Sequence, residues 1–225
     1  MAGKLIVLEG AEGVGKTTQL RLLAEWLESN GHDVVAVREP GGTVLGDEIR
    51  RILLDPASDI SARAEALLFM SSRAQLVERE IRPALSQNVV VLLDRFFLST
   101  YAYQCAGRGL PQEDVRASNR LATGGLVPDV TLLLMLPLSE GLARAERRGA
   151  PDRMERAAGD FHERVASAFT QFATAEWQRA HPECGPIVSI DARGDEQQVL
   201  ERVVAELTRR WPGSSLGDGM SARAR

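Results

Sequence analysis

The chain has 225 residues, of which 44% are hydrophobic and 26% are charged. These proportions are ordinary for a globular protein, and the length suffices for one well-buried domain without requiring two. The formal net charge of -4 argues against a large nucleic-acid-binding face, which would need an excess of basic residues.

The sequence shows no pattern of an exported or membrane-bound protein. Its start leads through a short apolar stretch directly into a glycine-rich loop, unlike a secretory signal peptide. No apolar run approaches the length of a membrane-spanning helix. The two cysteines, Cys105 and Cys184, form neither a disulfide framework nor a C-x-x-C metal spacing. We therefore expect a soluble cytoplasmic protein with no membrane partner.

Apolar, strand-like runs alternate with helical stretches along the chain. The expected strands are Leu5–Leu8, Val34–Val37, Val89–Leu93, Val130–Met135 and Ile187–Ile190. The expected helices are Leu20–Leu27, Asp47–Leu54, Ser61–Leu85, Gln112–Ala122, Asp160–Arg179 and Glu196–Arg210. This alternation predicts a doubly wound α/β domain, in which helices cover both faces of a mostly parallel sheet. We expect it to span residues 1–211, and the aperiodic segment 212–225 to be a disordered tail.

The longest expected helix, Ser61–Leu85, has an apolar stripe at helical spacing. Its members are Leu67, Met70, Ala74, Val77, Ile81 and Leu85. Ligands of doubly wound sheets bind at the carboxyl ends of the strands. We therefore expect the polar residues at those ends to face one crevice: Glu9–Gly10, Arg38–Glu39, Asp94–Arg95 and Asp191.

The stretch between the first strand and the first helix matches the phosphate-binding pattern G-x-x-x-x-G-K-[ST]. In such a loop, backbone N–H groups and the helix N-terminus bind a polyphosphate. Lys16 is expected at the β- and γ-phosphates and Thr17 at Mg²⁺. Lysine occurs only at positions 4 and 16, so a chance match is rare. The predicted ATP-binding residues are Gly10, Ala11, Glu12, Gly13, Val14, Gly15, Lys16, Thr17 and Thr18.

Asp94 and Arg95 follow the most strand-like run of the sequence. An acidic residue there is where P-loop proteins hold Mg²⁺, directly or through water. The guanidinium of Arg95 suits bidentate phosphate binding, although a surface salt bridge with Asp94 or Glu39 fits the sequence as well. We therefore predict a magnesium site at Thr17 and Asp94.

Three further features have both a functional and a structural interpretation. Phe69 and Arg73, four residues apart on a helix, suit a planar base, although their spacing alone favours a core phenylalanine with a snorkelling arginine. The arginine-rich segment 143–156 suits a mobile lid over phosphates, or a solvated helix end with Arg–Glu pairs. The carboxylate of Glu12 would repel phosphates, so we expect it to face either a sugar hydroxyl or solvent.

Taken together, these motifs resemble the thymidylate kinase family, which phosphorylates dTMP with ATP. The resemblance extends to about Trp211. It implies a nucleoside-monophosphate-kinase fold with a five-stranded parallel sheet, and a homodimer formed through helices that include the one carrying Phe69. The motifs that carry it are Glu9–Thr18, Arg38–Thr43, Asp94–Phe96 with Ser99–Gln104, and Asp152–Glu155.

The resemblance also implies individual roles in the dTMP site. Arg38 and Arg95 would hold the acceptor phosphate, and Tyr103 would lie against the deoxyribose, with Glu12 as a second contact to the sugar. At the base the implied residues are Phe69, which would stack on thymine, Arg73, which would bond its edge, and the nearby Thr100 and Gln104.

The glycine loop has no arginine of its own, so the sequence resembles the subgroup whose catalytic arginine comes from the lid. Glu146 stands where many relatives have arginine, which leaves Arg147, Arg148 and Arg153 as candidates for the contact. The predicted catalytic residues are Lys16, Arg95, Arg148 and Arg153.

Two other functions fit parts of the sequence. A nucleoside kinase would need a carboxylate base for the 5′-hydroxyl proton, and Glu39 could serve. A GTPase-like switch would share the glycine loop. However, neither lysine follows an asparagine, so the Asn-Lys-x-Asp run that recognises guanine does not occur.

Overall fold

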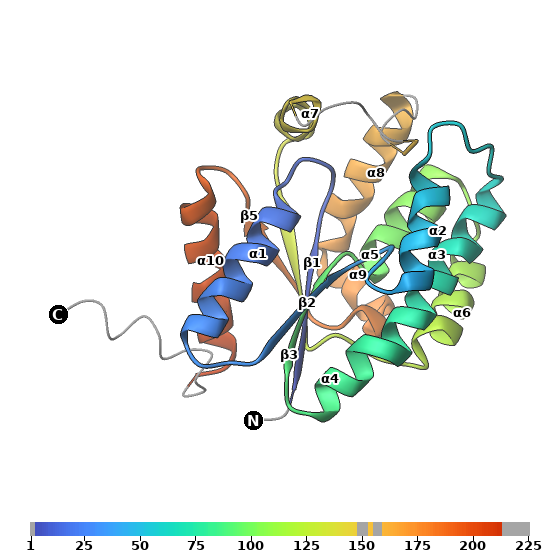
Figure 1. The fold of residues 1–225 in the computed structure, drawn as a ribbon. Coiled ribbons are helices and arrows are strands. Elements are labelled where there is room, and N and C mark those ends of the chain that lie inside the picture. The colour runs from blue at the N-terminus through green and yellow to red at the C-terminus, as the bar shows by residue number, and fades with distance from the viewer. Residues whose placement is uncertain (1–2, 148–152, 155–158, 213–225) are drawn as a thin grey trace.

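A five-stranded parallel sheet forms the centre of the computed structural model, which describes residues 3–147, 153–154 and 159–212. The strand order is β2-β3-β1-β4-β5, and every neighbouring pair is parallel (Figure 1). The strands are β1 (Lys4–Glu9), β2 (Val34–Arg38), β3 (Val90–Asp94), β4 (Val130–Met135) and β5 (Ile187–Asp191). All five expected strands are confirmed, with ends shifted by one residue at most.

Helices cover both faces of the sheet. The α-helices are α1 (Lys16–Ser29), α2 (Val44–Leu54), α3 (Ala62–Leu76), α4 (Arg82–Ser86), α5 (Phe97–Thr100), α6 (Gln112–Thr123), α7 (Leu138–Glu146), α8 (Gly159–Phe172), α9 (Ala175–Ala180) and α10 (Glu196–Arg210). Two π-helical segments, Val77–Ile81 and Tyr101–Gly107, and a 3-10 turn, Pro182–Cys184, join some of them. In Figure 1, α1 and α10 lie together on one side of the sheet, opposite α2, α3 and α6.

The two faces of β1 supply two separate hydrophobic cores. Leu5 and Val7 belong to the core under α5 and α8, whereas Ile6 and Leu8 belong to the core under α1 and α10. All four side chains are fully buried, as the continuous apolar run of a doubly covered strand requires. This double burial fixes the central strand, and with it the position of the loop that follows.

The expected helix Ser61–Leu85 is confirmed as a continuous rod of α3, a π-helical turn and α4. Ser61 caps its start by accepting a hydrogen bond from the backbone N–H of Ala64. Met70, Val77 and Ile81 of the expected stripe are buried. Leu67 of the same stripe is 60% exposed, because α3 turns this position away from the sheet.

Two helical predictions need correction. The expected helix Asp160–Arg179 breaks after Phe172, because Thr174 is extended and caps a new helix through the N–H of Trp177. The helical stretch Phe97–Gly107 was not predicted, since its own start carries no side-chain cap.

The expected tail at 212–225 lies, apart from Pro212, outside the described residues. So do residues 148–152 and 155–158 of the expected lid. Among the helices that are described, none is long and apolar enough to cross a membrane.

Leu27 allows a direct test of the core between α1 and α10. Its side chain is fully buried, so Leu27→Ala removes apolar contacts and leaves a cavity. We expect the free energy of unfolding, measured by urea denaturation, to fall by about 2–5 kcal/mol. Leu27→Met preserves the volume and should cost less than about 1.5 kcal/mol. Equal losses in the two variants would contradict this packing.

Candidate active site

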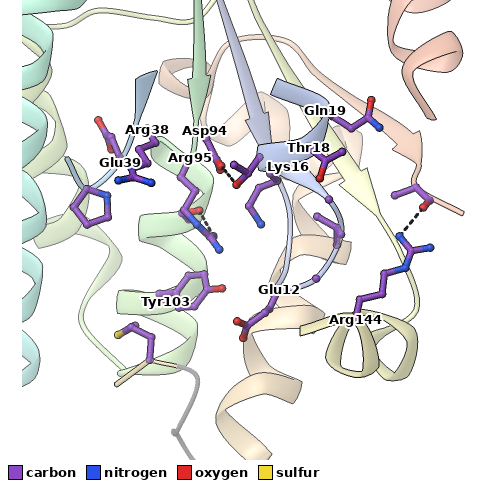
Figure 2. A pocket seen from close by; sticks show the side chains of 18 of the residues that line it. Glu12, Lys16, Thr18, Gln19, Arg38, Glu39, Asp94, Arg95, Tyr103 and Arg144 are labelled. Atoms are coloured by element: carbon purple, nitrogen blue, oxygen red, sulfur yellow. Dashed lines mark hydrogen bonds between the residues drawn. The ribbon is translucent and has the colours of Figure 1, made fainter. Parts of the chain in front are cut away.

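One large cavity of about 590 Å³ lies over the carboxyl ends of the central strands. It extends from the glycine loop and α1, past the ends of β2 and β3, to α3 and the helical stretch 97–107. Figure 2 shows side chains from these separate segments converging on it. The crevice expected from strand topology is therefore confirmed.

The glycine loop adopts a backbone that strongly favours glycine. Gly13 and Gly15 have φ values of 72° and 95°, in the left-handed region. A Cβ atom at Gly13 would lie 1.8 Å from the carbonyl oxygen of Gly141 in α7, so the loop and α7 pack backbone against backbone. Gly15 caps α1 without a side chain, which leaves the helix N–H groups available to an anion.

Residues Glu12 to Thr18 of the expected ATP loop all line the cavity. Gly10 and Ala11 contribute differently, because their carbonyl oxygens accept hydrogen bonds from Lys16 Nζ at 2.9 and 2.7 Å. Burial, and after it the charge of Arg95, lower the pKa of Lys16 to about 7. Above pH 7 the neutral amine therefore predominates in the free protein, and a bound anion would favour the ammonium form.

Thr17 and Asp94, the expected metal pair, are in direct contact. Thr17 Oγ1 donates a hydrogen bond of 2.7 Å to Asp94 Oδ2. The other carboxylate oxygen, Oδ1, is buried and has no partner among the described residues. A hard oxygen donor without a partner, beside a hydroxyl and a phosphate loop, fits a magnesium ion that keeps several waters.

Arg38 and Arg95 line the same side of the cavity (Figure 2). Arg95 Nη1 donates to Ser99 Oγ at 3.0 Å, and its guanidinium lies 5.3 Å from the ring centre of Tyr103. Burial alone would lower the pKa of Arg95, but nearby groups, Tyr103 and Asp94 foremost, raise it above its usual value. The alternative of a surface salt bridge for Arg95 is wrong, because its partners are a hydroxyl and an aromatic ring.

Glu12 extends from the loop toward the side of the cavity that holds Tyr103, away from Lys16 (Figure 2). Its charge also contributes to the raised pKa of the Tyr103 hydroxyl, after burial and the opposing effect of Arg95. The carboxylate is therefore separated from the loop N–H groups, as expected for a residue that would otherwise repel phosphate.

Phe69 and Arg73 have different surroundings. Phe69 is half-buried and lines the cavity. Arg73 is only 2% exposed, so the interpretation as a snorkelling arginine is wrong. Its five N–H donors are all used, in hydrogen bonds to oxygen atoms of Glu39, Thr100, Asn119 and Phe96. A ligand that bonds to Arg73 must therefore replace one of these partners.

Gln104 and Arg153 both bind the buried carboxylate of Glu65. Gln104 Nε2 donates to Oε1 at 3.0 Å, and Arg153 Nη2 donates to Oε2 at 2.6 Å. Arg153 also donates from Nε to the carbonyl oxygen of Leu53 at the end of α2. Gln104 lines the cavity, whereas Arg153 does not and is bound to Glu65 and Leu53 instead. Arg148 lies outside the described residues.

The end of the cavity beyond the glycine loop was not predicted. It is bordered by Arg144 of α7 and by residues 192–196 after β5, with Arg144 Nη1 donating to Ala192 O at 3.4 Å (Figure 2). The expectation was wrong for Asp191, whose exposed carboxylate pairs with Arg193 instead. It was also wrong for Glu9, which is completely buried. Gly194, in the loop that follows β5, is a sequence feature that could have indicated this end of the cavity.

The cavity has a P-loop at one side and two arginines with an aromatic platform at the other, and it lies on a five-stranded parallel sheet. This combination is that of a P-loop nucleotide kinase. The family model described as "Thymidylate kinase" matches residues 8–183. The chain belongs to the thymidylate kinase family, a family of ATP-dependent nucleoside monophosphate kinases. The expected family and fold class are both confirmed.

Individual relatives match over nearly their full lengths. The thymidylate kinase of Deinococcus radiodurans is 46% identical over 208 residues, covering 92% of this chain and 98% of the relative. One from a Synechococcus strain is 47% identical over 214 residues, covering 94% and 98%. The crystal structure of thymidylate kinase from Ehrlichia chaffeensis superposes with a TM-score of 0.74 at 28% identity, covering 92% of this chain and all of that chain.

Breaking the buried ion pair of Glu39 and Arg73 should cost more stability than breaking an exposed ion pair does. Glu39→Ala leaves the Arg73 charge buried without its main partner, and should reduce the free energy of unfolding by about 3–5 kcal/mol in urea denaturation. In the exposed pair of Arg51 and Glu48, Glu48→Ala should cost at most about 1 kcal/mol. Similar losses for both variants would contradict a structural role for the buried pair.

Proposed function

We infer that the protein transfers the γ-phosphoryl group of ATP to dTMP, giving dTDP and ADP, as a step toward dTTP. The observation that carries this conclusion is the single cavity that joins a P-loop to a second phosphate site at Arg38 and Arg95. A regulatory ATP-binding protein needs only the first of these sites. Two phosphate sites in one cavity instead bring a donor and an acceptor together.

The donor half consists of the glycine loop and the cavity end beyond it. The loop N–H groups and Lys16 bind the ATP phosphates. Arg144 and the 192–196 segment border the space that remains for the adenine ring. The carbonyl partners of Lys16 then exchange for phosphate oxygens, which form stronger, charge-assisted hydrogen bonds.

Thr17 and Asp94 hold Mg²⁺ beside the phosphates, directly or through water. The unpartnered Oδ1 of Asp94 supports this assignment. When bound there, the ion would help to neutralise charge on the transferring phosphoryl group.

The acceptor half provides one group of residues for each part of dTMP. Arg38 and Arg95 bind the phosphate, and Tyr103 and Glu12 lie at the deoxyribose. Phe69 stacks on thymine, with Thr100 and Gln104 nearby. Arg73 can bond the edge of the base if it gives up its hydrogen bond to Thr100 or to Asn119. The neutral oxygens of these two residues are weaker acceptors than the carboxylate of Glu39.

The reaction needs no general base, because the dTMP phosphate is already a dianion above a pKa of about 6. Catalysis consists of aligning the two phosphates and neutralising the charge between them. Lys16 and Arg95 supply positive charge from opposite sides. Arg148 and Arg153 are further candidates from the lid, and Arg153 must leave Glu65 to reach a phosphate. Glu39, paired with Arg73, is not needed as a base.

We also propose a homodimer formed through α3 and α6. These helices pack together and expose Leu67 and Leu121, at 60% and 87%, and Val127 follows α6 at 46%. Large apolar side chains on adjoining helices are a surface that a second copy can cover. We place the enzyme in the cytoplasm, since both cysteines, Cys105 and Cys184, are free thiols.

A coupled assay with ATP and a set of acceptors tests the function. We expect phosphorylation of dTMP to exceed that of dUMP, dCMP, AMP and thymidine, with little ATP hydrolysis when no acceptor is present. Lys16→Ala should abolish turnover, since it removes the charge at the transferring phosphate. Activity on thymidine alone would favour a nucleoside kinase, and acceptor-independent hydrolysis would favour a nucleotide switch.

The lowered pKa of Lys16 predicts proton uptake on ATP binding. At pH 8 Lys16 is mostly neutral in the free protein, because its pKa is about 7. Bound phosphates favour the ammonium form, so binding of Mg-ATP should take up close to one proton at pH 8 and much less near pH 6. Isothermal titration calorimetry in two buffers with different ionisation enthalpies measures this uptake.

Two lysine variants complete the proton-uptake measurement. Lys16→Met should abolish the uptake, whereas Lys4→Arg, which keeps the ion pair with Asp129, should leave it unchanged. Equal binding enthalpies in both buffers at pH 8 for the unmodified protein would contradict a neutral Lys16.

A further inference from the structure

Arg95 has a backbone conformation that its side chain does not favour. Its φ of 74° lies in the left-handed region, which a bulky residue adopts only when its surroundings enforce it. Two hydrogen bonds to the β1 segment flank it: Arg95 N donates to Leu8 O at 3.0 Å, and Phe96 N donates to Glu9 Oε1 at 2.7 Å. The end of β1 therefore holds Arg95 in this conformation.

Glu9 also holds the start of the helical stretch after Arg95. Its completely buried carboxylate accepts hydrogen bonds from the backbone N–H of Ser99 at 3.0 Å and from Ser99 Oγ at 2.7 Å. Helix α5 has no side-chain cap of its own, so Glu9 satisfies N–H groups that the helix leaves open. A residue of strand β1 thus caps a helix that begins almost ninety positions later.

The Ser99 hydroxyl connects Glu9 to the guanidinium of Arg95. A hydroxyl has one hydrogen, and Ser99 donates it to Glu9 Oε2, which can only accept. The oxygen of Ser99 is then free to accept from Arg95 Nη1, at 3.0 Å. Glu9 therefore fixes the donor-to-acceptor direction of the two hydrogen bonds, from Arg95 to Ser99 and from Ser99 to Glu9.

Tyr103 is a second neighbour of the guanidinium, with its ring centre 5.3 Å from the central carbon of Arg95. Ser99 and Tyr103 both lie on the helical stretch Phe97–Gly107. The guanidinium contacts both of them, while Arg95 still lines the cavity. Its orientation is set before any ligand arrives.

We propose that Glu9 and Ser99 are positioning residues that aim Arg95 at the acceptor phosphate. This inference rests on the proposed function, in which Arg95 binds dTMP. Because Glu9 directly precedes the P-loop, the same short segment of β1 sets the position of the donor loop and the orientation of the acceptor arginine. Neither residue needs to touch a substrate to have this effect.

Ser99→Ala tests the chain of hydrogen bonds. We expect the KM for dTMP to rise about tenfold and kcat to fall, while the KM for ATP stays within about twofold, since only the acceptor arginine loses its partner. A purely structural loss would impair both substrates together. Ser29→Ala, which removes an exposed hydroxyl far from the cavity, is the matched control and should leave all constants unchanged.

Glu9→Gln tests the direction of this chain of hydrogen bonds. The Gln oxygen still accepts the backbone N–H groups, but its amide donates where the carboxylate accepted, so the Ser99 hydroxyl hydrogen loses its acceptor and the hydroxyl is no longer fixed toward Arg95. The variant should remain folded by thermal unfolding and show the same selective rise in the KM for dTMP. Wild-type constants in both Ser99→Ala and Glu9→Gln would overturn the proposal.

A double-mutant cycle separates an effect through Arg95 from a general one. Arg95→Ala should weaken dTMP binding by itself, and adding Ser99→Ala should weaken it little further in calorimetric titration with dTMP. Additive losses would overturn the proposal. If the unmodified enzyme phosphorylates dTMP while neither Ser99→Ala nor Glu9→Gln changes the constants, only this inference fails. If the unmodified enzyme does not phosphorylate dTMP, the proposed function fails and the inference with it.

Discussion

The parallel pairing of β1, β3 and β2 is the constraint on which the site depends. Leu8 pairs with Asp94, and Asp94 pairs with Arg38, so the three strands end at the same level. Backbone hydrogen bonds continue the pairing past the strand ends, from Glu39 N to Asp94 O and from Arg95 N to Leu8 O. A shift of one residue would turn Asp94 and its neighbours to the opposite faces of the sheet.

Several charged side chains are buried around the cavity. Lys16, Asp94 and the pair of Glu39 and Arg73 lie within a few residues of these strand ends, or on helices packed against them. Burying such groups costs free energy, and their mutual contacts offset only part of that cost. In the proposed function their value lies in catalysis, because fixed charges and dipoles stabilise developing charge without having to reorganise.

Strand β1 and the residues next to it connect the proposed ATP site to the proposed dTMP site. Gly13 packs on Gly141 of α7, which joins the donor loop to the start of the expected lid. On the other side, Glu9 joins the same strand to the helical stretch that carries Ser99 and Tyr103. A kinase that must bring two anions together gains from holding both sites on one strand, since their relative position then varies little.

The sequence by itself determined the fold class, the P-loop and, apart from Glu9 and Asp191, the residues that meet at the strand ends, because periodicity and glycine spacing are local properties. It could not determine that Arg73 pairs with Glu39, that Glu65 holds Gln104, or that Glu9 caps a helix. These contacts join residues 34 to 90 positions apart, and a buried partner is known only after the elements have packed. For the same reason, the helix at Phe97–Gly107 was missed, since its start depends on a carboxylate from another strand.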